Sequence, residues 1–226
     1  MSIFGKPLQV LILSKTITIM GAPGETVTYS GAESGSVTLD SNGDATVSLR
    51  SGTYTFVGSI SGTKSNVTVS GGAVTMWPDN VEILYWYGRY GTGITAGTAL
   101  GGTSYANRSV TFNANDIVTF AGARGYNGSH STYAAVYFAG ANTTGKTSVG
   151  IIITDITNSG YSGGTRRRTI GQSSSAGGAY TQEITAAGTY TIPLDSNTYI
   201  GARNYVGNSN TSYANAYMTI GAYWLE

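Results

Sequence analysis

The sequence predicts an all-β protein built from two antiparallel β-sandwiches. Apolar and polar residues alternate along most of the 226-residue chain, as they do in strands that bury one face. Turn-forming Gly, Asn and Asp residues interrupt these runs roughly every ten residues, which is typical of sandwiches. No stretch long enough for a helix shows the apolar period of about 3.6 residues.

Seven alternating runs predict the strands of a first domain. They cover residues 16–19, 26–29, 36–39, 45–49, 53–57, 66–69 and 74–76. Pairs such as Asn42-Gly43 and Gly71-Gly72 separate them, and such pairs favour tight turns. The polar positions hold Thr and Ser rather than charged residues. We therefore expect sheets with one buried face and one face in water.

A change of composition near Trp77 and Pro78 divides the chain. Pro78 cannot continue an inner strand, and the Asp-Asn pair that follows it favours a turn. Only two of the 17 Tyr residues precede this segment. The predicted organisation is an N-terminal arm at residues 1–7, a docking or spacer domain at 8–77, a linker at 78–80 and a binding domain at 81–226.

Nine further runs predict that the second domain is also all-β. They cover residues 81–87, 109–112, 117–121, 133–138, 148–156, 180–184, 189–192, 199–202 and 214–224. This number of strands in a domain of this length favours a jelly-roll-like sandwich over a barrel of short hairpins.

An internal repeat lies within the second domain. Residues 121–126 (AGARGY) match 200–205 (IGARNY), and residues 133–137 (YAAVY) match 213–217 (YANAY). Two copies are too few for a solenoid. We therefore expect two equivalent strand–loop–strand units in one sandwich.

The composition excludes several classes of protein. The chain has no Cys, which excludes disulfides, thiolate metal sites and Cys nucleophiles. A net charge of +1 is too small for bulk electrostatic binding to nucleic acid. No apolar run approaches the roughly 20 residues of a membrane span, and the apolar segment near the N-terminus is shorter than a signal-peptide core. We expect no membrane insertion, no metal and no cofactor.

Catalytic groups are sparse. We interpret the single His, His130, as a solvated loop residue. No Gly-x-Ser-x-Gly elbow lies on a strand-to-helix turn, because the sequence predicts no helix for it to open. Asp116 and Asp195 could form the carboxylate pair of a polysaccharide depolymerase, but both lie in ordinary turn pairs. We expect a protein that is not an enzyme, with the depolymerase as the alternative.

The triplet Arg166-Arg167-Arg168 is the densest charge in the sequence. It lies between a Ser-Gly-Gly run and a Ser-Ser-Ser run, in a flexible loop or at the start of a strand. One interpretation is a contact with anionic groups of a partner. The other is a solvated edge strand whose charges prevent unwanted pairing.

The second domain is rich in Tyr, Gly, Ser and Asn, the mixture found in binding paratopes. The same groups suit sugars, although Tyr is equally suited to strands and subunit interfaces. We expect the ligand to bind to loops of the two repeated units. The alternative is a structural turn in which Arg covers an aromatic ring. The predicted ligand-binding residues are Arg124, Tyr126 and Asn127 in one loop and Arg203, Tyr205 and Asn208 in the other.

Two stretches resemble known families. Residues 41–56, SNGDATVSLRSGTYTF, resemble the core of PEGA-like, carboxypeptidase-regulatory-like immunoglobulin-type modules, which have a turn, an alternating strand and Gly-x-Tyr-x-Phe. This resemblance covers residues 15–76 loosely and implies an Ig-like or transthyretin-like sandwich that serves as a spacer. Residues 84–88, LYWYG, open a Gly/Thr/Tyr-rich β domain that is similar to the distal domains of prophage structural proteins.

Together these resemblances imply a bacteriophage virion surface protein of the tail-fibre or capsid-decoration type. The expected partners are other virion proteins, further copies of the chain in a homo-oligomer such as a trimer, and a host cell-surface glycan. The expected location is the virion, assembled in the host cytoplasm and extracellular in the mature particle. Two alternatives stay open: a capsid-decoration or head-fibre protein with purely assembly contacts, and a carbohydrate-binding module of a secreted enzyme.

Overall fold

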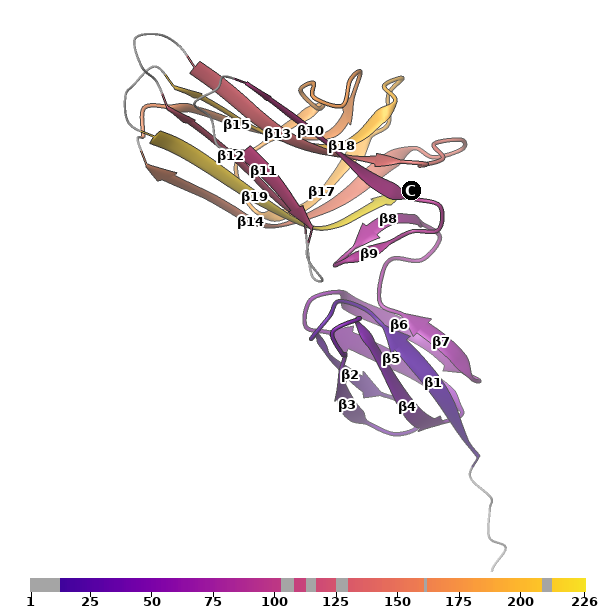
Figure 1. Ribbon diagram of the computed structural model, residues 1–226. Helices are drawn as coiled ribbons and strands as arrows, with labels where there is room; N and C mark the ends of the chain where they lie inside the picture. The colour runs from indigo at the N-terminus through magenta and orange to yellow at the C-terminus, as the bar shows by residue number, and fades with distance from the viewer. Residues whose placement is uncertain (1–12, 103–107, 113–116, 125–129, 161, 209–212) are drawn as a thin grey trace, which may run out of the picture. The chain divides into compact units, whose positions relative to one another are not determined.

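The computed structural model describes residues 13–102, 108–112, 117–124, 130–160, 162–208 and 213–226. The chain divides into two compact units between Trp77 and Pro78, where the predicted linker begins. Strands make up most of both units, and the described residues contain no helix, so the predicted all-β class is confirmed (Figure 1). None of the described segments forms a helix that could cross a membrane. The predicted arm at residues 1–7 lies outside the described residues.

Seven strands of the first unit lie within the described residues, and each coincides with a predicted run to within a few residues. They are β1 (Ser14–Met20), β2 (Thr26–Ser30), β3 (Gly35–Thr38), β4 (Asp44–Arg50), β5 (Gly52–Gly58), β6 (Gly62–Val69) and β7 (Gly72–Thr75). One sheet has the order β4-β1-β7 and the other β3-β2-β5-β6. The β1–β7 pair is parallel, and the remaining pairs are antiparallel.

The core of the first unit receives side chains from both sheets. Ile17 and Ile19 of β1 and Tyr54 and Phe56 of β5 are all buried in one apolar cluster. They are spaced by two residues because alternate side chains of a strand share a face. The Ig-like or transthyretin-like assignment of this sandwich stays a prediction.

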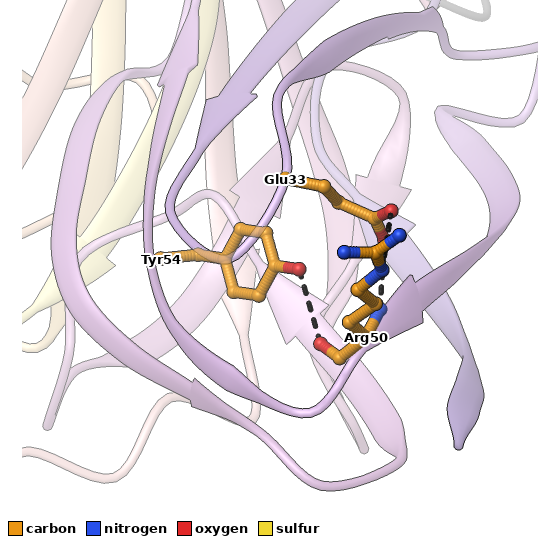
Figure 2. Close-up of polar contacts among 3 residues, drawn as sticks. All are labelled: Glu33, Arg50 and Tyr54. Carbon is orange, nitrogen blue, oxygen red and sulfur yellow. Dashed lines mark hydrogen bonds and ion pairs between the residues drawn. The ribbon is translucent and has the colours of Figure 1, made fainter. Parts of the chain in front are cut away.

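Tyr54 fixes the crossover from β4 in one sheet to β5 in the other. Its hydroxyl donates a hydrogen bond to the Arg50 carbonyl, four residues earlier, at 3.0 Å (Figure 2). Glu33 closes the same corner, because its carboxylate accepts the Arg50 backbone N–H at 2.7 Å and lies 3.8 Å from the Arg50 Nε. A Tyr hydroxyl bonded to the backbone a few residues upstream is the tyrosine corner of Ig-type sandwiches.

Glu25 joins two loops of the first unit. Its side chain is fully buried. Its carboxylate accepts the backbone N–H groups of Ala22 at 3.0 Å, Ile60 at 2.9 Å and Ser61 at 2.6 Å. It also accepts the Ser61 hydroxyl at 2.7 Å. These four donors compensate for the loss of water around the carboxylate.

Twelve strands of the second unit lie in the described residues. They are β8 (Glu82–Trp86), β9 (Arg89–Tyr90), β10 (Thr95–Gly102), β11 (Arg108–Phe112), β12 (Ile117–Arg124), β13 (His130–Ala139), β14 (Ser148–Gly160), β15 (Thr165–Ser173), β16 (Gln182–Ile184), β17 (Gly188–Pro193), β18 (Tyr199–Asn208) and β19 (Tyr213–Leu225). All nine predicted runs overlap these strands, whereas β9, β10 and β15 were not predicted.

The second unit consists of two antiparallel sheets. One sheet has the order β10-β13-β18-β15-β16, and the other has β11-β12-β19-β14-β17, with the β8–β9 hairpin attached to β19 (Figure 1). Buried side chains of both sheets, such as Phe138 of β13 and Tyr223 of β19, form one apolar cluster. The unit is therefore a sandwich, and its jelly-roll-like classification stays a prediction.

The internal repeat is visible in the strand pairing. Strands β12 and β13 belong to the first copy, and β18 and β19 belong to the second. Each strand of one copy pairs with a strand of the other, β12 with β19 and β13 with β18. Arg124 pairs with Tyr213, and His130 pairs with Asn208. The end of β12, the start of β13, the end of β18 and the start of β19 therefore lie at one end of the sandwich.

Candidate ligand-binding site

The arginine triplet begins strand β15, and alternation along the strand separates its members. Successive side chains of a strand point to opposite faces. Arg166 and Arg168 bond to strands of the other sheet, whereas Arg167 is exposed. Of the two predicted placements, the start of a strand is the observed one.

Arg166 and Arg168 connect the two sheets of the second unit. The Arg166 Nε donates to the Asn215 carbonyl of β19 at 2.9 Å. The Arg168 Nε donates to the Tyr217 carbonyl of β19 at 3.0 Å, and its Nη2 donates to the Thr157 carbonyl of β14 at 2.7 Å. Arg168 is only 5% exposed, so its guanidinium is not available to an outside anion. The expectation of a solvated strand is also wrong at this position.

Strand β18 lies beside β15 and carries Arg203 and Tyr205. The register pairs Thr169 with Arg203 and Arg167 with Tyr205. The guanidinium carbon of Arg203 lies 4.5 Å from the ring centroid of Tyr133, on β13, and 5.2 Å from that of Tyr205. Aromatic faces attract cations through the ring quadrupole. These contacts hold the Arg203 side chain across β13 and β18, which agrees with the predicted alternative that an Arg covers an aromatic ring.

A hollow of about 520 Å³ opens over β15 and β18, and we name it the β15–β18 pocket. Two guanidinium groups, a carboxylate, three threonine hydroxyls and two phenol rings line it. They come from β15, β16, β18 and the connection between β15 and β16. The lining residues are Thr165, Arg167, Thr169, Ala179, Tyr180, Thr181, Glu183, Arg203 and Tyr205.

The connection between β15 and β16 is held against its sheet by Tyr180. The backbone N–H of Tyr180 donates to the Thr169 hydroxyl at 3.0 Å. The buried Tyr180 hydroxyl lies within hydrogen-bond distance of two carbonyls, Ala176 at 3.2 Å and Val136 at 3.4 Å. This side of the pocket is therefore ordered before a ligand arrives, which lowers the entropic cost of binding.

The pocket has an excess of positive charge, because Arg167 and Arg203 outnumber Glu183. Within the described residues, the Arg167 guanidinium has no hydrogen-bond or ion-pair partner, and the Arg203 Nε is buried without one. Burial lowers the pKa of Arg203 below its usual value, and the nearby phenol of Tyr133 opposes that shift. Arginine stays cationic in proteins. Both guanidinium groups therefore carry a positive charge and keep N–H donors for an acceptor.

The structure brings together residues from two separate predictions. Arg203 and Tyr205 of the predicted ligand site line one pocket with Arg167 of the triplet. The predicted loop at residues 203–208 is wrong, because these residues belong to strand β18. The buried Asn204 conceals this strand in the sequence, since a polar residue occupies an inward position and its amide donates to the Ala216 carbonyl at 2.7 Å.

The structure does not place the other predicted ligand residues in the pocket. Tyr126 and Asn127 lie outside the described residues. The structure describes only the backbone of Arg124, at the end of β12, and of Asn208, at the end of β18. His130 begins strand β13 rather than lying in a loop.

Of the predicted carboxylate pair, only Asp195 lies within the described residues. The Asp195 Oδ1 accepts the Asn197 backbone N–H at 2.7 Å, and its Oδ2 accepts the Asn197 amide at 2.8 Å, which is a turn-forming arrangement. Asp116 lies outside the described residues. In the part of the chain that the structure describes, no three His, Cys, Asp or Glu side chains gather as they would around a metal ion.

Six of the nine lining residues were not predicted as site residues from the sequence, and Glu183 and Thr169 are two of these six. Register pairs them across β15 and β16. The signal that could have found Thr169 is its spacing of two residues from Arg167. That spacing has meaning only once the triplet is placed in a strand.

The fold and the pocket together define a two-unit, all-β protein with a polar and aromatic pocket on its second sandwich. No family model matches the chain, and no curated protein or solved structure matches it. The chemistry of the pocket is therefore the main guide to function.

Proposed function

We propose that the chain is a non-enzymatic glycan-binding protein and that the β15–β18 pocket holds the sugar. The observation that carries this proposal is the meeting of Tyr205 with the unpartnered guanidinium groups of Arg167 and Arg203. Sugars present C–H faces that pack on aromatic rings and hydroxyls that bond to Arg, Thr and carboxylate side chains. The volume of about 520 Å³ lies within the usual range for ligand pockets, about 300–1,000 Å³.

The biological setting we propose is host adhesion from the surface of a bacteriophage virion, as in a tail fibre. The resemblances of residues 41–56 and 84–88 support it, and the tyrosine corner of Tyr54 is compatible with an Ig-type spacer. In this proposal the first unit docks to other virion proteins, and the second unit binds a host cell-surface glycan. The protein is then assembled in the host cytoplasm and is extracellular in the mature particle.

The test is binding of the fluorescently labelled full chain to an array of bacterial surface glycans. We expect the wild-type chain to bind a subset of these glycans. Arg167→Ala should weaken that binding about tenfold, which corresponds to roughly 1.4 kcal/mol. Lys15→Ala removes one exposed positive charge from the first unit and is the matched control, with no expected effect. Absence of binding by the wild type, or equal binding by Arg167→Ala, would contradict the proposal.

A second role, self-assembly or capsid decoration, is favoured by exposed apolar side chains on the second unit. Tyr90, Leu100 and Phe112 are 41%, 46% and 38% exposed, and the rings of Tyr90 and Phe112 lie 6.5 Å apart. Aromatic residues of this kind are enriched in subunit interfaces. Light scattering after size-exclusion chromatography should give a multiple of 23.4 kDa, such as the mass of a trimer. A monomer at all concentrations would refute this role.

A further inference from the structure

We propose that the glycan bound in the β15–β18 pocket carries an anionic group, a carboxylate or a sulfate ester, which Arg167 and Arg203 bind together. This inference rests on the proposed glycan-binding function and names the substrate class. Its basis is the difference between the guanidinium groups that already donate to backbone carbonyls and those that have no acceptor within the described residues.

Three arginines of β15 and one of β18 divide into two groups. The guanidinium groups of Arg166 and Arg168 donate hydrogen bonds to backbone carbonyls of β14 and β19, so these two side chains connect the sheets. Arg167 and Arg203 lie on the pocket and have no acceptor within the described residues. A guanidinium that keeps free N–H donors is suited to bidentate binding of two oxygens of a carboxylate or a sulfate.

Arg203 makes the stronger case for an anion. Its guanidinium is positioned by the rings of Tyr133 and Tyr205, so little side-chain entropy is lost when an acceptor arrives. Its Nε is buried and unbonded, and a buried charged donor without an acceptor is costly. An anionic oxygen in the pocket would offset part of that cost through charge-assisted bonds to the remaining N–H donors of the guanidinium.

The protein's own carboxylate does not take this place. Glu183 lines the same pocket, yet the described residues contain no ion pair between it and either arginine. Two guanidinium groups and one carboxylate give the pocket a formal net charge of one positive unit. A single anionic group on the sugar therefore neutralises it, while Glu183 and the threonine hydroxyls remain available to sugar hydroxyls.

The test uses matched pairs of saccharides and isothermal titration of the full chain. One pair is trigalacturonate and its methyl ester, and the other is 3′-sulfolactose and lactose. These pairs separate a carboxylate from a sulfate ester as the source of the charge. We expect an acidic member to bind at least about tenfold more tightly than its neutral partner, with an affinity that falls as salt is raised.

Variants locate the preference within the molecule. Arg167→Ala should remove the preference for the acidic sugar and change the affinity for the neutral sugar much less. Arg167→Gln is a second variant of similar size, and Lys15→Ala is the control that should retain the preference. A thermal midpoint close to that of the wild type shows that each variant is folded.

The outcomes distinguish the two levels of the proposal. Equal affinity for the acidic and neutral members of each pair overturns the anionic class and leaves glycan binding intact. Binding of none of the four saccharides overturns the anionic class, and glycan binding is then decided by the array. An acidic preference that survives both Arg167 variants overturns the assignment to this pocket.

Discussion

Replacing Arg168 with Ala removes the guanidinium that joins β15 to both β14 and β19. The side chain is 5% exposed, and two of its hydrogen bonds reach the backbone carbonyls of Tyr217 and Thr157. A third bond reaches the side-chain oxygen of Asn158. The substitution leaves these acceptors without their donor in the interior of the second unit.

The magnitude follows from the number of bonds and the cost of the buried charge. A hydrogen bond to a charged group contributes about 1.5–3 kcal/mol, so the two backbone bonds account for roughly 3–6 kcal/mol. Burying the Arg168 guanidinium costs free energy in the wild type, which reduces the difference. Burial also lowers the pKa of Arg168, consistent with that cost. We expect the free energy of unfolding to fall by about 3–5 kcal/mol, or the thermal midpoint by roughly 10 °C.

The assay is urea unfolding followed by tryptophan fluorescence, with two comparison variants. Arg167→Ala removes the neighbouring charge on the exposed face, and it should change the free energy of unfolding by no more than about 0.5 kcal/mol. Arg168→Met keeps much of the apolar stem but no donor, and it should be destabilised like Arg168→Ala. Wild-type stability of Arg168→Met, or equal stability of Arg168→Ala and Arg167→Ala, would refute the reasoning.

Three further predictions concern stability. Tyr54→Phe removes the hydroxyl that donates to the Arg50 carbonyl and should lower the free energy of unfolding by about 1 kcal/mol. Amide hydrogen exchange should become faster in the first unit and not in the second, and an unchanged exchange pattern would refute this prediction. Glu25→Gln replaces a carboxylate that accepts four hydrogen bonds with an amide whose N–H groups face some of those donors. Urea unfolding should show that the free energy of unfolding falls by about 2–4 kcal/mol. A fall of less than about 0.5 kcal/mol would count against the role of Glu25. Burial raises the pKa of Tyr180 and Tyr223 above 10.0, so above pH 10 the unfolded chain releases phenol protons that the folded chain keeps. The free energy of unfolding should therefore be constant up to about pH 10 and fall above it. Urea midpoints that stay level to about pH 12 would contradict this prediction.

The strand pattern of the first unit could be predicted from the sequence because its buried faces are simply apolar. Ile17 and Ile19 alternate with Thr, and the charged residue of β1, Lys15, lies at the exposed start of the strand. The strands that escaped prediction break this rule for reasons of packing. In β10, Gly97 and Gly101 lie against the rings of Tyr137 and Tyr133, where an added Cβ would come within 2.2 Å and 2.3 Å of ring atoms. These glycines are spacers for tyrosine rings rather than strand breakers.

Strand β15 escaped prediction because arginine occupies inward positions. The sequence shows three adjacent charges, and only the tertiary structure supplies the β14 and β19 carbonyls that make buried Arg168 acceptable. The complete site could not be predicted for the same reason, because it also depends on tertiary structure. Arg203 and Tyr205 were predicted from the repeat, but their union with Arg167 and Glu183 depends on the pairing of β18 with β15 and of β15 with β16.

One repeated feature could have been found in the sequence and was not. The tetrapeptide Gly-Thr-Tyr-Thr occurs at residues 52–55 and again at residues 188–191. In both places the Tyr hydroxyl donates to the carbonyl four residues earlier, Tyr54 to Arg50 at 3.0 Å and Tyr190 to Ala186 at 2.6 Å. The motif therefore marks a tyrosine corner in each unit of the chain.

The proposed location of the glycan site is tested most directly by mapping bound sugar onto the backbone with NMR. The experiment titrates isotopically labelled full chain with the tightest-binding saccharide from the array and follows amide chemical shifts. The account predicts that the largest shifts fall on the pocket strands β15, β16 and β18, around Thr169, Glu183 and Arg203. Shifts confined to other strands, or no shifts with any saccharide, would contradict it.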